Sequence, residues 1–154
     1  MPVDLKAVER YLHTHIPLTR AMRVSVEAID EHGVRLAAPL APNINHRNTV
    51  FGGSAGTLAI LSAWTLLHTR LGRTAPPSQI VIQRSSVEYL SPLHGDFQAF
   101  CPSPEPARWD RFAASLERRG RGRITLRAEI LGNGEVAGRF EGVYVVMPRS
   151  EASA

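Results

Sequence analysis

Residues 41–54 of the chain read APNINHRNTVFGGS, and residues 55–71, AGTLAILSAWTLLHTRL, follow directly as its most apolar segment. The apolar segment has hydrophobic residues on nearly every side of a helix, which predicts a helix buried inside the protein. The pair Gly52-Gly53 would stand at the start of this helix. Backbone N–H groups there lack intrahelical partners and carry the positive end of the helix dipole. Such a helix start suits an oxyanion or a polarised carbonyl.

The loop before this helix is rich in uncharged hydrogen-bonding side chains, at Asn43, Asn45, Asn48 and Thr49. One helix cap needs only one such residue, so their number favours a binding role. The alternative is structural, an N-cap and a set of Asx turns in front of a buried helix. The residues alone leave both interpretations open.

Segments with a two-residue hydrophobic period flank the helix and predict strands. Two precede it and four follow it, at 23–30, 34–40, 80–90, 97–101, 124–131 and 136–147. The sequence LGNGE at 131–135 predicts a hairpin between the last two strands. Shorter helices are predicted at 4–15, closed by Pro17, and at 107–118. One antiparallel sheet must cover the buried helix and therefore curl around it, which makes the fold class α+β.

Length and composition indicate one globular domain. The 154 residues are 44% hydrophobic and 21% charged, which is typical of a folded protein. We expect the domain at 21–148, an N-terminal helix and extension at 1–20, and a loose tail at 149–154. No signal sequence is visible, the apolar segment is too short to span a membrane, and the lone Cys101 fits a reducing compartment. The expectation is a cytoplasmic protein with no membrane partner.

Much of the net charge of +4 lies in one run, RRGRGR at 118–123. Such a run can bind nucleic acid, an anionic membrane or a polyphosphate, or it can be a solvated turn without a partner. The run contains no aromatic side chain on which a base could stack. We therefore expect no nucleic-acid partner.

Three segments carry a resemblance to a known family: LAPNINHRNTVFGGS at 40–54, SVEYLSPLHGDFQAF at 86–100 and FEGVYVVMP at 140–148. They resemble the YiiD C-terminal family of thioesterases. The resemblance implies the hot-dog fold, a curved antiparallel sheet wrapped around a long central helix. It also implies action on acyl-CoA or acyl-carrier-protein thioesters, within fatty acid metabolism. A homodimer or a dimer of dimers is expected, paired through the sheet edge at 80–90.

The resemblance also assigns candidate catalytic residues. In hot-dog thioesterases a backbone N–H at the start of the central helix points at the thioester oxygen, and the corresponding residue here is Gly52 or Gly53. A loop asparagine helps to hold the attacking water in the acyl-CoA thioesterases of this class. Asn45 corresponds to it, with Asn48 as a second candidate.

The base that activates this water is harder to assign. Related enzymes place an acid two turns beyond the first glycine, where this chain has Ile60. Glu88 is then the candidate base, because it is the only carboxylate between residues 54 and 94. The expected substrate contacts are a group of polar, aromatic and basic side chains at Thr49, Phe51, Ser54, Thr57, Arg119, Arg121 and Arg123.

The missing acid leaves two functions open, slow hydrolysis of acyl thioesters or binding of them without turnover. Gly52–Gly56 also matches G-x-S-x-G, the nucleophile elbow of α/β-hydrolases, but no buried strand is predicted before Ser54. The histidines are scattered, so we expect no metal. We expect no cofactor either, because coenzyme A would enter as part of the substrate. An acyl carrier protein is the candidate protein partner.

Overall fold

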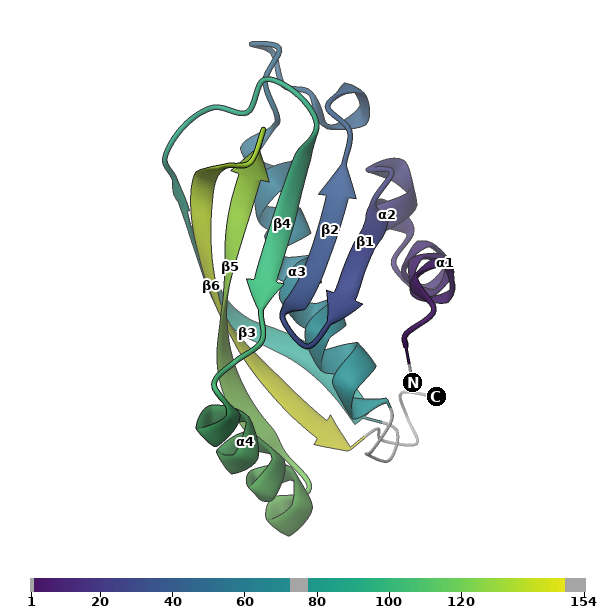
Figure 1. The fold of residues 1–154 in the computed structure, drawn as a ribbon, viewed down its shortest axis with the longest axis vertical. Helices are drawn as coiled ribbons and strands as arrows, with labels where there is room; N and C mark the ends of the chain where they lie inside the picture. The colour runs from purple at the N-terminus through teal and green to yellow at the C-terminus, as the bar shows by residue number, and fades with distance from the viewer. Residues whose placement is uncertain (1, 73–77, 149–154) are drawn as a thin grey trace.

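The computed structural model of the protein describes residues 2–72 and 78–148, so the expected tail at 149–154 lies outside the described residues. The predicted helices and strands are present, with ends shifted by at most three residues (Figure 1). Their bounds are α1 Leu5–His15, α2 Pro17–Ala21, β1 Ser25–Asp30, β2 Gly33–Ala38, the short 3-10 helix η1 Ala41–Asn43, α3 Gly52–Leu71, β3 Ser78–Tyr89, β4 Phe97–Pro102, α4 Pro106–Arg119, β5 Gly122–Gly132 and β6 Glu135–Pro148.

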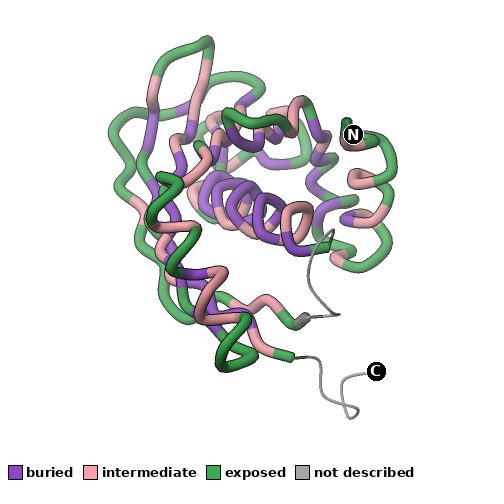
Figure 2. The backbone as a smooth tube through the Cα atoms, turned by 60° about the horizontal axis from the view of Figure 1, so that its bottom comes forward, coloured by how far each residue is buried: buried purple, intermediate pink, exposed green. Residues whose placement is uncertain are grey.

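The strands form a six-stranded antiparallel sheet in the order β1-β2-β4-β5-β6-β3. The turn between β5 and β6 has φ of 52° at Asn133 and 77° at Gly134, as a type I′ hairpin turn requires. β3 lies at one edge of the sheet and pairs with β6 from Ser78 to Tyr89. The sheet curves around α3 in both views (Figures 1 and 2), which confirms the predicted wrapped-helix fold.

Most of the central helix α3 is buried (Figure 2). Its sequence places apolar residues on almost every side of the helix, as a helix inside a protein requires. The sheet also bonds to it, since the Tyr144 hydroxyl of β6 donates to the Ile60 carbonyl at 2.8 Å. Between residues 55 and 68, the positions that are not fully buried are Thr57, Ile60, Trp64 and His68. Their spacing of three or four residues continues the face that begins at Gly53. One narrow stripe of α3 therefore remains accessible, and it starts at the predicted site.

The N-terminal helices pack onto the same core. The Asp4 carboxylate caps α1 by accepting from the Ala7 N–H at 3.1 Å. Pro17, predicted to close α1, instead begins α2, a position that suits its fixed φ and missing N–H. Leu12 of α1 is fully buried in the hydrophobic core that also contains α3 and the sheet. α1 is therefore an integral part of the packing.

A column of rings joins α1 to the second half of α3. Tyr11 stacks on His15 and on His68, with ring centroids 4.0 and 4.5 Å apart, and His68 stacks on Trp64 at 4.8 Å. Burial, and to a smaller extent the neighbouring His15, lowers the pKa of His68. His68 is consequently held in its neutral form at neutral pH.

The helix α4 covers a part of β5 that lacks a neighbouring strand. Within the described residues, β4 pairs with β5 only over residues 98–100, so the first half of β5 is open on that side. Two side chains of α4 bond to this open edge. Arg108 donates to the Thr125 carbonyl, and the Ser115 hydroxyl donates to the Arg121 carbonyl at 2.9 Å. These bonds satisfy backbone groups that would otherwise be free to pair with another chain.

Candidate active site at the start of the central helix

Asn45 holds the loop before α3 in shape. Its amide nitrogen donates to the Thr49 hydroxyl at 2.9 Å and to the Val50 carbonyl at 3.3 Å. Its amide oxygen accepts from the N–H groups of Arg47 and Thr49 at 2.8 and 3.1 Å. An asparagine side chain has two donor hydrogens and two acceptor lone pairs, so these four bonds use all of them. Asn48 is exposed with φ of 62°, a left-handed conformation that asparagine tolerates. Both predicted water-binding residues therefore shape the loop in this structure.

Asn43 anchors the base of the same loop. Its side-chain nitrogen donates to the carbonyls of Met22 and Pro39 at 3.0 and 2.8 Å, and its own carbonyl accepts from the Phe51 N–H at 2.8 Å. The Asn43 side chain is buried, and its Oδ1 has no hydrogen-bond partner among the described residues. A buried oxygen of this kind is a common sign of a bound water or ligand.

The first turn of α3 leaves two backbone N–H groups free. The Phe51 side chain makes no capping bond, while its carbonyl accepts from the N–H groups of Ser54 and Ala55 at 2.9 and 3.1 Å. The N–H groups of Gly52 and Gly53 have no acceptor in the part of the chain that the structure describes. They lie at the positive end of the dipole of a 20-residue helix. The Phe51 ring lies against Gly53 and would collide with a Cβ there.

Tyr89, the last residue of β3, is bonded to this first turn. Its hydroxyl donates to the Gly52 carbonyl at 2.9 Å. A Cβ at Gly52 would lie 3.5 Å from the ring and one at Gly56 3.4 Å from the hydroxyl, so Tyr89 packs directly over both glycines. The Gly52 carbonyl and the Gly53 N–H belong to one peptide group, and a bond to the carbonyl makes that N–H a stronger donor. This contact was not predicted, although the alternation of Val87 and Tyr89 toward α3 is a signal for it.

Two pockets flank the first turn of α3. One, of about 260 Å³, lies between Gly52 and residues 89–93. The other, of about 350 Å³, lies beside α2 and η1, and it brings Gly53 together with three of the expected substrate contacts, Phe51, Ser54 and Thr57. Thr49 lines neither pocket. The free N–H groups are thus surrounded by uncharged surface, over which Phe51 and Tyr89 are each 57% exposed.

The two positions discussed for a base do not bring a carboxylate to these N–H groups. Ile60 lies on the accessible stripe of α3 that begins at Gly53, but its side chain is apolar and carries no carboxylate. Glu88 lies on the opposite face of β3 from Val87 and Tyr89, because alternate residues of a strand point to opposite faces. Its exposed carboxylate is 3.9 Å from the Arg139 guanidinium. Within one chain, Glu88 is therefore not brought together with the free N–H groups of Gly52 and Gly53.

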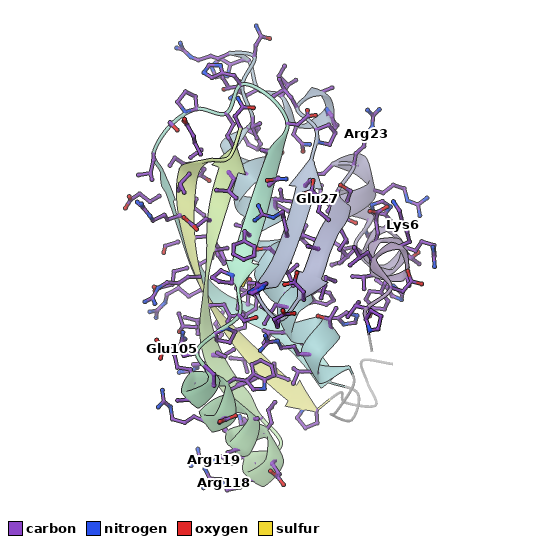
Figure 3. All side chains as sticks on the ribbon, in the orientation of Figure 1. Lys6, Arg23, Glu27, Glu105, Arg118 and Arg119 are labelled. Carbon is purple, nitrogen blue, oxygen red and sulfur yellow. The ribbon has the colours of Figure 1, made fainter. Side chains whose placement is uncertain are left out.

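The three arginines expected to contact phosphate do not form one cluster. Arg119 lies at the tip of α4 (Figure 3) and Arg121 in the turn that follows, and both are exposed. Arg123 instead lines a pocket between α4 and β5, together with Arg108 and Arg111. The last two were not predicted as ligands, because their nearness to Arg123 depends on how α4 packs.

This arginine pocket lies far from the start of α3. Arg123 is seven residues along β5 from Ile130, which lines the pocket beside Gly52. At about 3.3 Å per residue, the two positions are roughly 23 Å apart along the strand. Figure 1 shows α4 at the opposite end of the sheet from the loop that precedes α3.

Other chemistry considered from the sequence finds no support in the geometry. Ser54 follows a loop with an isolated bridge between Ile44 and Val50, so it is not on a nucleophile elbow. Residues 2–72 and 78–148 contain no group of three or more His, Cys, Asp or Glu side chains that could hold a metal. Cys101 is buried in the core, and this burial raises the pKa of its thiol to about 12, so the thiol is not a nucleophile at neutral pH. No helix of the described chain is long and apolar enough to cross a membrane.

Solved structures of other proteins share this architecture. A protein of unknown function from Chlorobaculum tepidum is 26% identical, with a TM-score of 0.89 and 94% of each chain covered. A putative thioesterase from Shewanella oneidensis is 24% identical, with a TM-score of 0.84, covering 94% of this chain and 97% of that one. A probable thioesterase from Pseudomonas aeruginosa is 20% identical, with a TM-score of 0.79 and coverage of 97% and 99%. These likenesses confirm the hot-dog fold.

A family model described as "Putative thioesterase (yiiD_Cterm)" matches residues 5–148. The match includes the loop before α3, the glycine pair and the strand that ends in Tyr89, which are the parts that build the site. It also confirms the resemblance noted in the sequence. The chain therefore belongs to the yiiD C-terminal family of putative thioesterases.

Proposed function

We propose that the protein hydrolyses acyl thioesters, carried by coenzyme A or by an acyl carrier protein, at the start of α3. The observation that carries this proposal is the pair of free N–H groups at Gly52 and Gly53. Attack of water on a thioester places negative charge on the carbonyl oxygen, and donors already in position stabilise that charge without reorganising. Membership of a thioesterase family supports the same reaction.

Tyr89 and Asn45 act in this proposal as positioning residues. The bond from the Tyr89 hydroxyl fixes the peptide group between Gly52 and Gly53 and strengthens its N–H as a donor. The four hydrogen bonds of Asn45 fix the conformation of the loop that precedes α3. The pocket beside Gly53, with Phe51 in its wall, is the proposed site for the acyl group.

The attacking water has no strong base on α3, since no Asp or Glu occurs between residues 54 and 71. General-base assistance is worth about 10²–10⁴-fold, so the proposed turnover is slow. The same observation favours the second candidate function, a module that binds acyl thioesters without hydrolysing them. Measured turnover separates the two functions.

A homodimer paired through β3 is part of the proposal. β3 is a 12-residue edge strand, and apolar side chains on it and just beyond it are exposed, at Ile82, Tyr89 and Leu90. An exposed edge of this length invites pairing with a second copy. Such pairing would also cover Tyr89 and exclude water from its bond to Gly52.

The test measures thiol release from acyl-CoAs of several chain lengths by wild type, Gly52→Pro and Gly52→Ala. Proline is favoured at the first position of a helix and removes the N–H, and Phe51 before it already has the extended ψ of 131° that proline requires. Alanine keeps the N–H and meets only ordinary contacts with Tyr89. If Gly52 donates to the oxyanion, Gly52→Pro lowers the rate by about 10²–10³-fold and Gly52→Ala leaves it nearly unchanged.

Other outcomes would redirect the proposal. Acyl-CoA binding without thiol release by the wild type would favour the binding module. A rate of thiol release that stays at the wild-type value in both Gly52→Pro and Tyr89→Phe would place the active site elsewhere.

A further inference from the structure

The pocket between α4 and β5 gathers three arginines from two elements. Its volume is about 200 Å³, and Arg108, Arg111 and Arg123 share its lining with the polar residues Ser115 and Thr125. Arg108 and Arg111 are three residues apart and lie on the same face of α4, while Arg123 comes from β5. The packing of α4 onto the open edge of β5 therefore brings positive charge together from opposite walls.

The charges in this pocket are not neutralised by neighbouring carboxylates. In the described part of the chain, none of the three guanidinium groups lies within 4.0 Å of an Asp or Glu oxygen. The bond from Arg108 goes to a neutral acceptor, the Thr125 carbonyl. Like charges held together repel one another, and an anion between them would relieve that repulsion. Guanidinium groups match phosphate oxygens in pairs of parallel hydrogen bonds.

The edge of β5 adds a backbone donor to the same wall. The carbonyls of Arg121 and Thr125 point toward α4, because α4 side chains donate to them. In an antiparallel strand the N–H and C=O of one residue point to the same side, and this side alternates along the strand. The N–H of Arg123, midway between the two, therefore also faces α4. At about 30 Å³ per water, the pocket has room for roughly seven waters, enough for the five non-hydrogen atoms of a phosphate group.

We propose that this pocket is a phosphate-binding site, separate from the start of α3, that takes a phosphate monoester or diphosphate. Arg111 and Arg123 bind the phosphate oxygens from the two walls, and Arg108 contributes charge while bonded to β5. The site does not depend on the hydrolysis proposed above, because binding alone tests it. The phosphate can belong to the nucleotide end of coenzyme A or to an unrelated phosphate compound.

The experiment titrates the whole protein with pyrophosphate by isothermal calorimetry at low salt. The variants are Arg111→Gln and Arg123→Gln, each with an exposed side chain, and the control is Arg10→Gln on α1, which loses the same charge away from the pocket. Each pocket variant is expected to weaken pyrophosphate binding about tenfold, the usual size for a lost charge-assisted hydrogen bond. The control is expected to bind nearly like the wild type, because Arg10 does not line the pocket and acts on a bound anion only through the long-range Coulomb energy, which falls with distance. Thermal unfolding verifies that each variant is folded.

Three further probes, coenzyme A, dephospho-coenzyme A and pantetheine, identify the source of the phosphate. If coenzyme A loses affinity in the pocket variants and pantetheine does not, the source is the nucleotide end, and dephospho-coenzyme A shows which phosphate is bound. If pyrophosphate alone loses affinity, the source is another phosphate compound. Pyrophosphate that fails to bind the wild type, or that binds both pocket variants as tightly as Arg10→Gln, overturns the proposal. Thiol release is not used in this test, so the two proposals fail independently.

Discussion

The start of α3 and the arginine pocket offer a negative group two different kinds of partner. At α3 the donors are the backbone N–H groups of Gly52 and Gly53, surrounded by uncharged surface. At the arginine pocket the donors are three guanidinium groups. Neutral donors suit charge that exists only during a reaction, whereas guanidinium groups suit a charge that is permanent. The molecule thus separates surface suited to chemistry from surface suited to binding by roughly 23 Å along β5.

The largest effect is expected when a charged side chain is introduced on α3, near the uncharged surface at its start. Ile60→Asp should raise the rate of thiol release by about 10²-fold or more, because it supplies a base on the accessible stripe that begins at Gly53. Ile60→Asn is the matched control, since it has a similar size and no base. Equal rates for the two variants would show that a carboxylate at this position does not activate the water. A lower melting temperature for the Asp variant alone would show that burial keeps it neutral.

Removing the loop scaffold should have the next largest effect. Asn45→Ala deletes four hydrogen bonds and should lower thiol release by about 10²-fold, because the oxyanion donors lose their position. Asn45→Asp keeps both acceptor bonds and should be less affected. Pyrophosphate binding at α4 should not change in either variant. Fast hydrolysis by Asn45→Ala would mean that the loop does not position the site.

Charge reversal distinguishes the arginines of the basic run. If coenzyme A supplies the phosphate, Arg123→Glu should raise KM for acyl-CoA about tenfold at low salt, with kcat nearly unchanged. Arg119→Glu, at the exposed tip of α4, should raise KM less. The difference should shrink as salt is added, because screening weakens exposed charges. A kcat that falls with Arg123→Glu would argue against the separation of binding from chemistry.

A smaller effect is expected from Tyr89→Phe, which removes one hydroxyl and keeps the ring between Gly52 and Gly56. Loss of one neutral hydrogen bond is worth about 1 kcal/mol, so kcat should fall about fivefold while KM stays constant. The ¹⁵N resonance of Gly53 should shift as well, because the Gly52 carbonyl of the same peptide group loses the Tyr89 hydroxyl that donates to it. Glu88→Gln, the adjacent residue on the outer face, is the control. A larger loss with Glu88→Gln would place the base on β3.

The smallest effect concerns stability, away from both sites. The pKa of His68 is lowered in the folded state by burial and by His15, so the unfolded chain binds its proton more readily. The contribution of His68 to the free energy of unfolding is therefore complete above its unfolded pKa of about 6.5, and it is lost as pH falls below that value. The melting temperature should drop between pH 7.5 and 5.5, and less steeply in His68→Phe, which keeps a ring in the stack. Equal slopes would show that the pH dependence has another origin.

The start of α3 could be predicted because its parts are adjacent in the sequence. The glycine pair and the apolar run that follows it define a buried helix with free N–H groups, and no distant residue is needed for that inference. The role of Asn45 in shaping the loop could not be predicted. Only the geometry of the loop shows that all four hydrogen-bonding positions of its side chain are taken.

The arginine pocket was missed for a different reason. Sequence grouped Arg119, Arg121 and Arg123 because they are neighbours in the chain. The structure groups Arg123 with Arg108 and Arg111 because β4 leaves β5 and α4 takes its place along the open edge. Residues brought together by packing leave no local pattern, and the same holds for Tyr89 and Gly52, which are 37 positions apart.

The pairing of β3 with β6 sets the order in which the protein can be assembled during synthesis. β3 is the first strand made after α3, yet it pairs with β6, from Ser78 opposite Pro148 to Tyr89 opposite Gly138. Until β6 has left the ribosome, β3 has no partner strand and the apolar sides of α3 stay partly uncovered. Contacts between segments so distant in sequence form slowly, and uncovered apolar surface attracts chaperones or other chains. A nascent chain stalled before β6 would therefore contain Tyr89, but it would have neither a finished core nor the partner strand that holds this tyrosine beside Gly52.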